Sequence, residues 1–267
     1  ARKILASQLI LLYTQHMPTL EYTMNPKYVH AAVTVYEHLR LTLKTHAEDK
    51  YHNDSLMSDM VYSPLTVVYR NPDASEPRKF DVVETRRKWM HDTAKDPWIE
   101  GHWAEFGVRE GQTIGYLLEA KPDQEIHAFD SWEGLPEEWH DGGNRYQKGD
   151  MTVDIPNFPP NVKCHKGWFK DTIDTWLQEH KGPMAYVHID SDLYSSAKTV
   201  LNKLNDRIVP ETILVFDEIA NFRGSGKMSN WYKHEWLALN EWLREFDRGV
   251  APIRRTCMYQ AAFRVTK

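Results

Sequence analysis

Short apolar segments alternate with segments of helical length from residue 98 to the end of the chain, and this alternation restricts the fold more than any other feature of the sequence. It predicts a doubly wound α/β fold, in which a mostly parallel sheet carries helices on both faces. The expected strands are 103–107, 125–130, 162–165, 184–190 and 212–217, followed by a terminal hairpin of 253–258 and 261–265. The expected helices are 111–120, 171–179, 195–205 and 232–246.

The N-terminal part of the chain has a different pattern. Apolar residues recur at helical spacing over 28–43, a short strand is expected at 65–69, and a short helix is expected at 81–91. We therefore interpret residues 1–95 as a mainly helical cap or lid. Residues 96–267 form the α/β core, and the two parts make one integrated domain.

Composition excludes several classes of protein. The chain of 267 residues has only 2 cysteines, which argues against a disulfide scaffold or a cysteine-rich zinc site and suits the cytoplasm. A net charge of −5 without a basic stripe argues against a nucleic-acid partner. No apolar run approaches the roughly 20 residues of a membrane span. The first residue is alanine, which fits a domain joined to glycosyltransferase domains in a longer chain, and a homo-oligomer is also allowed.

The first candidate site follows the strand at 103–107. Ligands of open α/β sheets bind beyond the carboxyl ends of the strands. There, Gly107 lets the backbone pass close to a ligand and Gly111 eases the turn into the next helix; the alternative is an ordinary turn. Asp130 ends the next strand, 23 positions after Gly107. A carboxylate at that place accepts the hydroxyl groups of a ribose, or else it caps a helix.

A second candidate site consists of acidic residues after two further strands. Asp190 ends the strand at 184–190, Asp217 ends the strand at 212–217, and Glu218 follows it. Adjacent parallel strands bring these carboxylates together, and they repel one another unless a cation joins them or one stays protonated. Oxygen ligands suit Mg²⁺ or another hard divalent cation. The alternative is that some of these acids cap the following helices.

Taken together, five sequence blocks fall in a recognisable order. They are Glu105-Phe106-Gly107-Val108, then 128–136, then 166–172, then 188–194, and finally Asp217-Glu218. This ordered set resembles the macrocin O-methyltransferase family, which methylates sugar hydroxyls of macrolide antibiotics. The resemblance covers roughly residues 100–220. It implies a Rossmann-like, seven-stranded class I methyltransferase sheet that uses S-adenosyl-L-methionine and Mg²⁺.

The resemblance also implies roles for individual residues. The methionine end of the cofactor is expected against the glycine turn, the ribose against Asp130, and the adenine near 167–169. The implied metal ligands are Asp190, Asp217 and Glu218, although the family usually has two aspartates where this chain has Asp217-Glu218. The full set expected to bind the cofactor is Glu105, Phe106, Gly107, Gly111, Thr113, Asp130, Ser131, Gly167, Trp168, Phe169 and Asp190.

These residues predict a metal-assisted transfer of a methyl group to a sugar hydroxyl of a glycan or glycoside, for example a deoxyhexose such as rhamnose. A divalent cation lowers the pKa of neighbouring hydroxyls, and Asp190 is the expected general base. His234 is a second candidate for contacting the substrate or sharing that role. The segment 132–146 and the N-terminal helices are expected to act as a lid.

Three other functions fit parts of the same pattern. A catechol or another vicinal diol binds a metal ion in the same way as a sugar diol. A nucleotide-binding oxidoreductase shares the fold, although the third glycine of its dinucleotide fingerprint is missing. A non-catalytic binding module is the last alternative, and the retained cluster of repelling acids argues against it.

Overall fold

The computed structural model of the chain describes residues 56, 57, 59, 60, 66–69, 82–222 and 228–267. Strands and helices alternate along most of this length, as the sequence pattern predicts. The strands are β1 (Val67–Tyr69), β2 (His102–Phe106), β3 (Ile126–Asp130), β4 (Trp139–His140), β5 (Arg145–Tyr146), β6 (Val162–Lys166), β7 (Met184–Ile189), β8 (Ile213–Phe216), β9 (Val250–Thr256) and β10 (Ala261–Val265). The helices are α4 (Val82–Thr93), α5 (Gln112–Ala120), α6 (Phe169–Glu179), α7 (Tyr194–Leu204), the short 3₁₀ helix η1 (Trp231–Lys233) and α8 (Glu235–Glu245).

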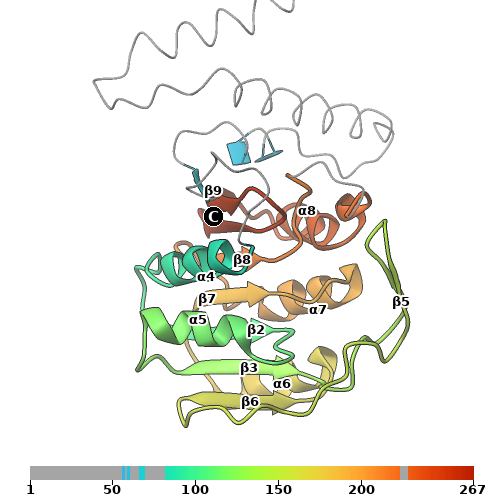
Figure 1. The fold of residues 1–267 in the computed structure, drawn as a ribbon. Helices are drawn as coiled ribbons and strands as arrows, with labels where there is room; N and C mark the ends of the chain where they lie inside the picture. Colours follow the sequence, from blue (N-terminus) through green and yellow to red (C-terminus); the bar gives the residue numbers. More distant parts are fainter. Residues whose placement is uncertain (1–55, 58, 61–65, 70–81, 223–227) are drawn as a thin grey trace, which may run out of the picture.

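The main sheet has the order β1-β9-β10-β8-β7-β2-β3-β6 (Figure 1). The five adjacent strands β8, β7, β2, β3 and β6 are parallel to one another. Strand β10 runs antiparallel to both of its neighbours, β8 and β9. Seven strands form the predicted doubly wound sheet, and β1 adds an edge strand parallel to β9. The chain order reverses between β2 and β7, so the carboxyl ends of these two strands flank the crevice in which such sheets bind ligands.

Two apolar clusters fill the two faces of the sheet because successive side chains of a strand point to opposite sides. On one face, Trp89 of α4 and Ile114 of α5 pack with Tyr186 of β7. On the other face, Trp176 of α6 packs with Val187 of β7 in the cluster that also holds the apolar residues of α7 and α8. Helices therefore cover both faces (Figure 1).

The predicted elements agree with the observed ones, with three differences. The expected helix 232–246 is divided into η1 and α8, because His234 has a non-helical backbone between them. The segment 132–146 contains the hairpin β4–β5, which the sequence pattern did not reveal. The helix expected at 81–91 within the N-terminal cap is α4, and it packs on the core sheet rather than apart from it. The periodic segment 28–43 lies outside the described residues, and the division into residues 1–95 and 96–267 stays a prediction.

Four histidines gather where β2, β3 and β6 meet α6. The Nδ1 atom of His127 lies 3.0 Å from Nε2 of His165, and the rings of His102 and His180 lie 5.6 and 4.7 Å from that of His127. Burial, followed by repulsion from His165, lowers the pKa of His127 to about 3. Burial also lowers the pKa of His165 to about 4. The folded chain therefore keeps both rings neutral well below neutral pH.

This cluster predicts an acid-sensitive fold. The ordinary histidine pKa is about 6.5, so below that pH the unfolded chain binds protons that the folded chain excludes, and the free energy of unfolding falls as the pH falls. For buried His127 the loss at pH 5 is about 1–2 kcal/mol relative to pH 7. Urea denaturation at pH 7 and at pH 5 measures this loss in the free energy of unfolding. The variant His127→Gln should show a smaller difference between pH 7 and pH 5, and an equal difference would contradict this account.

Candidate functional site

A cavity of about 680 Å³ opens at the carboxyl edge of the sheet. Its wall takes one residue from the end of each of five parallel strands: Gly107 after β2, Asp130 of β3, Gly167 after β6, Asp190 after β7 and Asp217 after β8. Ligand pockets of proteins are roughly 300–1,000 Å³, so this space suits a cofactor together with part of a substrate. The cavity therefore lies where the strand order predicts a binding site.

Gly107 permits a close contact between the turns that follow β2 and β7. Its φ angle is +89°, and a Cβ atom added there would lie 1.8 Å from the carbonyl oxygen of Asp190. The backbone N–H of Asp190 donates to the carbonyl of Phe106 at 2.9 Å, which holds the two turns together. Only glycine combines this φ angle with this approach. The turn therefore depends on Gly107 for its shape.

The carboxylate of Asp130 organises the same turn from β3. Its Oδ2 atom accepts hydrogen bonds from the backbone N–H groups of Val108 and Arg109, each at 2.8 Å. Its Oδ1 atom accepts a third from Trp132 at 2.7 Å. A carboxylate has about four lone-pair sites, so about one acceptor position remains for a ligand such as a ribose hydroxyl.

Behind the cavity wall lies a buried polar chain. Glu105 is fully buried; its Oε1 atom accepts a hydrogen bond from the Thr113 hydroxyl at 2.5 Å, and its Oε2 atom lies 3.1 Å from Nδ1 of His188. The other nitrogen of His188 lies 4.0 Å from Oδ1 of Asp217. Burial opposes the charged form of His188, but Glu105 outweighs it and raises its pKa. These contacts connect the wall at Thr113 with the acids at the other end of the cavity.

Four carboxylates line that other end: Asp190, Asp192, Asp217 and Glu218. Burial and then repulsion from Asp217 raise the pKa of Asp190 to about 7. Burial and then Asp190 raise the pKa of Asp192 to about 8, and burial with Asp217 raises the pKa of Glu218 well above its usual range. Asp217 differs, because Arg86 and His188 outweigh its burial and lower its pKa.

A fifth acid, Glu235 at the start of α8, lies behind these four and is fully buried. Its two carboxyl oxygens accept hydrogen bonds from the backbone N–H groups of Ser191 at 3.3 Å and Glu218 at 3.0 Å. Burial raises its pKa well above the usual range. Glu235 therefore joins the loop after β7 to the loop after β8.

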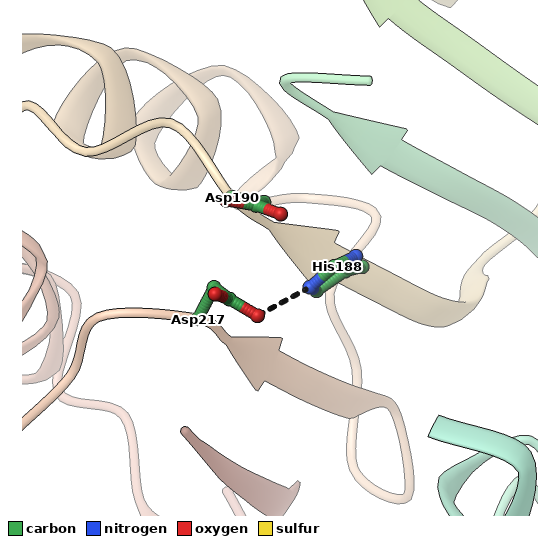
Figure 2. Close-up of side chains that lie close together, drawn as sticks. All are labelled: His188, Asp190 and Asp217. Atoms are coloured by element: carbon green, nitrogen blue, oxygen red, sulfur yellow. Dashed lines mark ion pairs between the residues drawn. The ribbon is translucent and has the colours of Figure 1, made fainter. Parts of the chain in front are cut away.

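The donor atoms fit a hard divalent cation. Figure 2 shows Asp190 and Asp217 after neighbouring strands and His188 within the strand that leads to Asp190, and one potential ligand atom of each lies within 4.8 Å of the others. The Nε2 atom of His188 and the Oε2 atom of Glu218 are buried without a hydrogen-bond partner. Carboxylate oxygens with one imidazole nitrogen suit Mg²⁺ or Mn²⁺. Asp217 has one further partner, since Gln260 donates to its Oδ2 atom at 3.2 Å.

A guanidinium group stands among these acids. Arg86 of α4 places Nη2 2.6 Å from Oδ2 of Asp190 and 2.8 Å from Oδ1 of Asp217, and its Nε donates to the same Asp217 oxygen at 3.1 Å. Burial disfavours this charge, but the surrounding acids raise the pKa of Arg86 above its already high usual value. Arg86 is therefore charged and offsets part of the negative charge of the cluster.

The structure brings most of the predicted site residues into the cavity wall. The predicted residues that line the wall are Gly107, Thr113, Asp130, Ser131, Gly167, Trp168, Phe169, Asp190, Asp217 and Glu218. Among the described residues of the predicted set, Glu105, Phe106, Gly111 and His234 lie outside the wall. Phe106 is buried and stacks on Phe129, with ring centroids 4.7 Å apart. Gly111, with a φ angle of +76°, faces the ring of Phe158.

His234 lies instead against the hairpin β4–β5. Its Nε2 atom is 3.1 Å from the carbonyl oxygen of His140, and its ring meets the edge of Trp139 at 6.3 Å. Asn230 donates to the same carbonyl at 2.7 Å. These contacts hold the hairpin to the start of α8. The catalytic role predicted for His234 stays a prediction, as does the closure of 132–146 as a lid.

Sequence reasoning gave no site role to four residues: Arg86, His188, Asp192 and Glu235. His188 had a detectable signal, because it is a polar residue inside an otherwise apolar strand that ends at Asp190. Glu235 had a weaker signal, since it begins a helix three residues after the aromatic pair Trp231-Tyr232. Arg86 is separated from its acidic partners by more than 100 residues, and no local pattern indicates that contact.

Comparison with known proteins gives a family match over part of the chain. Residues 104–219 match a protein family described as a methyltransferase domain, and this range contains the end of β2, the strands β3 to β8 and most of the cavity wall. No match was found among curated protein sequences. The match over residues 104–219 agrees with the methyltransferase resemblance that the sequence blocks carry.

Three solved structures are similar to the chain, and one of them has a TM-score above 0.5. The calicheamicin methyltransferase CalS11 is 18% identical, with 90% of this chain and 93% of that chain covered and a TM-score of 0.55. The O-methyltransferase NovP is 18% identical over 89% of this chain and all of its own, with a TM-score of 0.46. The MycE methyltransferase, solved in complex with Mg and SAH, is 15% identical over 68% of this chain and 49% of its own, with a TM-score of 0.45. The likeness to CalS11 and the strand order confirm the predicted Rossmann-like class I methyltransferase fold.

The close backbone contact at Gly107 leads to a test with an internal control. Gly107→Ala should lower the free energy of unfolding by roughly 2–4 kcal/mol, because the left-handed φ angle and the clash with backbone add. Gly115→Ala in α5 meets no atom within 4 Å and should be neutral or stabilising by about 0.5–1 kcal/mol. Urea unfolding compares the two variants. If both variants have the stability of the unmodified chain, the contact at Gly107 is not as tight as described.

Proposed function

We propose that this chain is an S-adenosyl-L-methionine-dependent, divalent-metal-assisted O-methyltransferase that acts on a sugar hydroxyl of a glycan or glycoside. The observation that carries the proposal is the acidic cluster around Asp190 and Asp217, which lies in the same cavity as the glycine turn and Asp130. One end of the cavity suits an adenosine-containing cofactor. The other end has the donor atoms for a cation that binds the hydroxyl groups of an acceptor.

The residues divide into two groups by their contacts. Asp130, with one acceptor position left, is placed for a ribose, and Gly167, Trp168 and Phe169 supply a surface for the adenine. Asp190 and Asp217, with Glu218 beside them, would hold the cation, which when bound lowers the pKa of a neighbouring sugar hydroxyl. S-adenosyl-L-methionine supplies the methyl group. Bound Mg and SAH in MycE are consistent with this pair of ligands.

A carboxylate of the cluster takes the hydroxyl proton. Asp190 is our proposed base, because it lies in the cavity wall beside Asp217, at the end where the acceptor hydroxyl would bind. Asp192, which faces the same cavity with a pKa of about 8, is the second carboxylate within reach. Glu235 keeps the loops that carry these acids in register. The positioning of the acceptor oxygen against the methyl group then determines the rate.

The aromatic part of the cavity wall supports a sugar acceptor. Trp139 and Tyr146 of the hairpin β4–β5 line the cavity and stack on each other, with ring centroids 4.9 Å apart. Aromatic faces suit the apolar face of a sugar ring, and a methyl-bearing deoxyhexose presents more apolar surface than a hexose. CalS11 is described as a TDP-rhamnose 3'-O-methyltransferase, so a rhamnose derivative is the first acceptor to test.

Methyl transfer to a panel of acceptors tests the proposal. The chain is incubated with S-adenosyl-L-methionine, Mg²⁺ and a rhamnoside, a nucleotide-linked deoxyhexose, a hexoside or a catechol, and mass spectrometry detects the added methyl group. We expect transfer to a sugar and its loss when EDTA removes the metal. Asp217→Asn should lower kcat/KM by at least about 100-fold, because it removes a charged metal ligand.

Asp154→Asn is the matched control, because Asp154 is exposed and lies outside the cavity wall. Its kcat/KM should equal that of the unmodified chain. Methyl transfer to the catechol alone would show that the acceptor is a vicinal aromatic diol and not a sugar. Undiminished transfer in EDTA would refute the role of the metal. An active Asp190→Asn variant would exclude Asp190 as the base and point to Asp192.

Several finer expectations remain proposals. No helix among the described residues is long and apolar enough to span a membrane. The cytoplasmic location, a fusion to glycosyltransferase domains and a homo-oligomer are supported by sequence arguments alone.

A further inference from the structure

The position of Arg86 is fixed by the packing of α4. Trp89 and Met90 lie three and four residues after Arg86, hence on the same face of the helix, and both are fully buried against the sheet. The helix backbone is therefore held on the core. The side chain of Arg86 reaches from this anchored helix over the carboxyl edge of β7 and β8.

Arg86 occupies the place that a bridging cation needs. One nitrogen, Nη2, contacts Oδ2 of Asp190 at 2.6 Å and Oδ1 of Asp217 at 2.8 Å. A Mg²⁺ ion that joined the two aspartates through these atoms would lie about 2.0–2.1 Å from each. A guanidinium nitrogen and a metal ion cannot both contact this pair of oxygens. Metal binding through them therefore requires that Arg86 withdraw.

The charges around Arg86 show that it balances the cluster only in part. It faces Asp190 and Asp217 directly, while Asp192 and Glu218 line the same cavity and the imidazole nitrogen Nε2 of His188 is buried without a hydrogen-bond partner. One guanidinium charge leaves a surplus of acidic groups and an unused donor atom. The cluster therefore keeps its attraction for a divalent cation while Arg86 is in place.

We infer that Arg86 is an internal counter-cation, which closes the metal site of the metal-free chain and competes with the metal for Asp190 and Asp217. The inference rests on the proposed function, because it assumes the proposed metal site. Since Trp89 and Met90 anchor α4, the side chain of Arg86 swings away while the helix stays on the sheet. Arg86 thereby weakens metal binding and stabilises the chain when the metal is absent.

The test measures metal binding without catalysis. Mn²⁺ is titrated by calorimetry into the EDTA-treated full chain, into Arg86→Gln and into Arg87→Gln, with no cofactor or acceptor present. Arg87→Gln is the matched control, because it removes the same charge from the next residue, whose partners are Glu84 and Glu119 rather than the cluster. We expect Arg86→Gln to bind Mn²⁺ at least about tenfold more tightly than the unmodified chain. Arg87→Gln should match the unmodified chain.

Thermal unfolding gives a second readout. Without metal, Arg86→Gln should have a lower Tm than Arg87→Gln, and saturating Mn²⁺ should raise the Tm of Arg86→Gln the most. Arg86→Lys covers the case in which Arg86→Gln does not fold, because lysine keeps the charge but lacks the second donor, Nε, through which Arg86 also contacts Asp217. This variant should bind Mn²⁺ more tightly than the unmodified chain.

The outcomes separate this inference from the proposed function. Equal or weaker Mn²⁺ binding by the Arg86 variants, with Asp217→Asn binding less than the unmodified chain, would overturn the inference and leave the metal site standing. If Asp217→Asn bound Mn²⁺ as the unmodified chain does, or if no variant bound it, the proposed metal site would be wrong, and the inference would fall with it.

Discussion

Repulsion among carboxylates at one edge of the sheet is the constraint around which the site is arranged. Asp190, Asp192, Asp217 and Glu218 share one cavity wall, and burial strengthens their mutual repulsion because little water screens it. The fold offsets the repulsion with groups from several elements: Arg86 from α4, His188 within β7, and Gln260 before β10. Protonation of the remaining acids reduces it further. A site that needs so many compensating contacts is one in which the addition or loss of a single cation alters both shape and stability.

The same edge is held together mainly by backbone contacts. Gly107 brings the turn after β2 against the carbonyl of Asp190, and Glu235 joins the N–H groups of Ser191 and Glu218. The loops after β2, β7 and β8 are thus linked in series. Because each link uses backbone atoms, the relative positions of the loops do not depend on the rotamers of the acids that they carry. The acids can exchange partners while the loops stay in place.

The sequence predicted the part of the site that strand ends provide. Parallel strands place their carboxyl ends at one edge, so Gly107, Asp130, Asp190 and Asp217 could be brought together from their positions alone. Helix residues behaved differently, because the face a helix turns toward the edge depends on packing that no local pattern reveals. Arg86 was therefore missed. His234 was expected near the acids because it follows β8 in sequence, yet its side chain meets β4.

Asp130 has a consequence for the timing of ligand binding. Its three hydrogen bonds fix the turn around Val108, Arg109 and Trp132 without any ligand. This turn has already lost its conformational entropy during folding. The affinity of an incoming nucleoside is therefore not reduced by the cost of ordering the turn. Association at this end is then limited by diffusion and orientation rather than by rearrangement. The acidic end, where Arg86 must move first, is slower by comparison, so the two ends of one cavity are expected to fill at different rates.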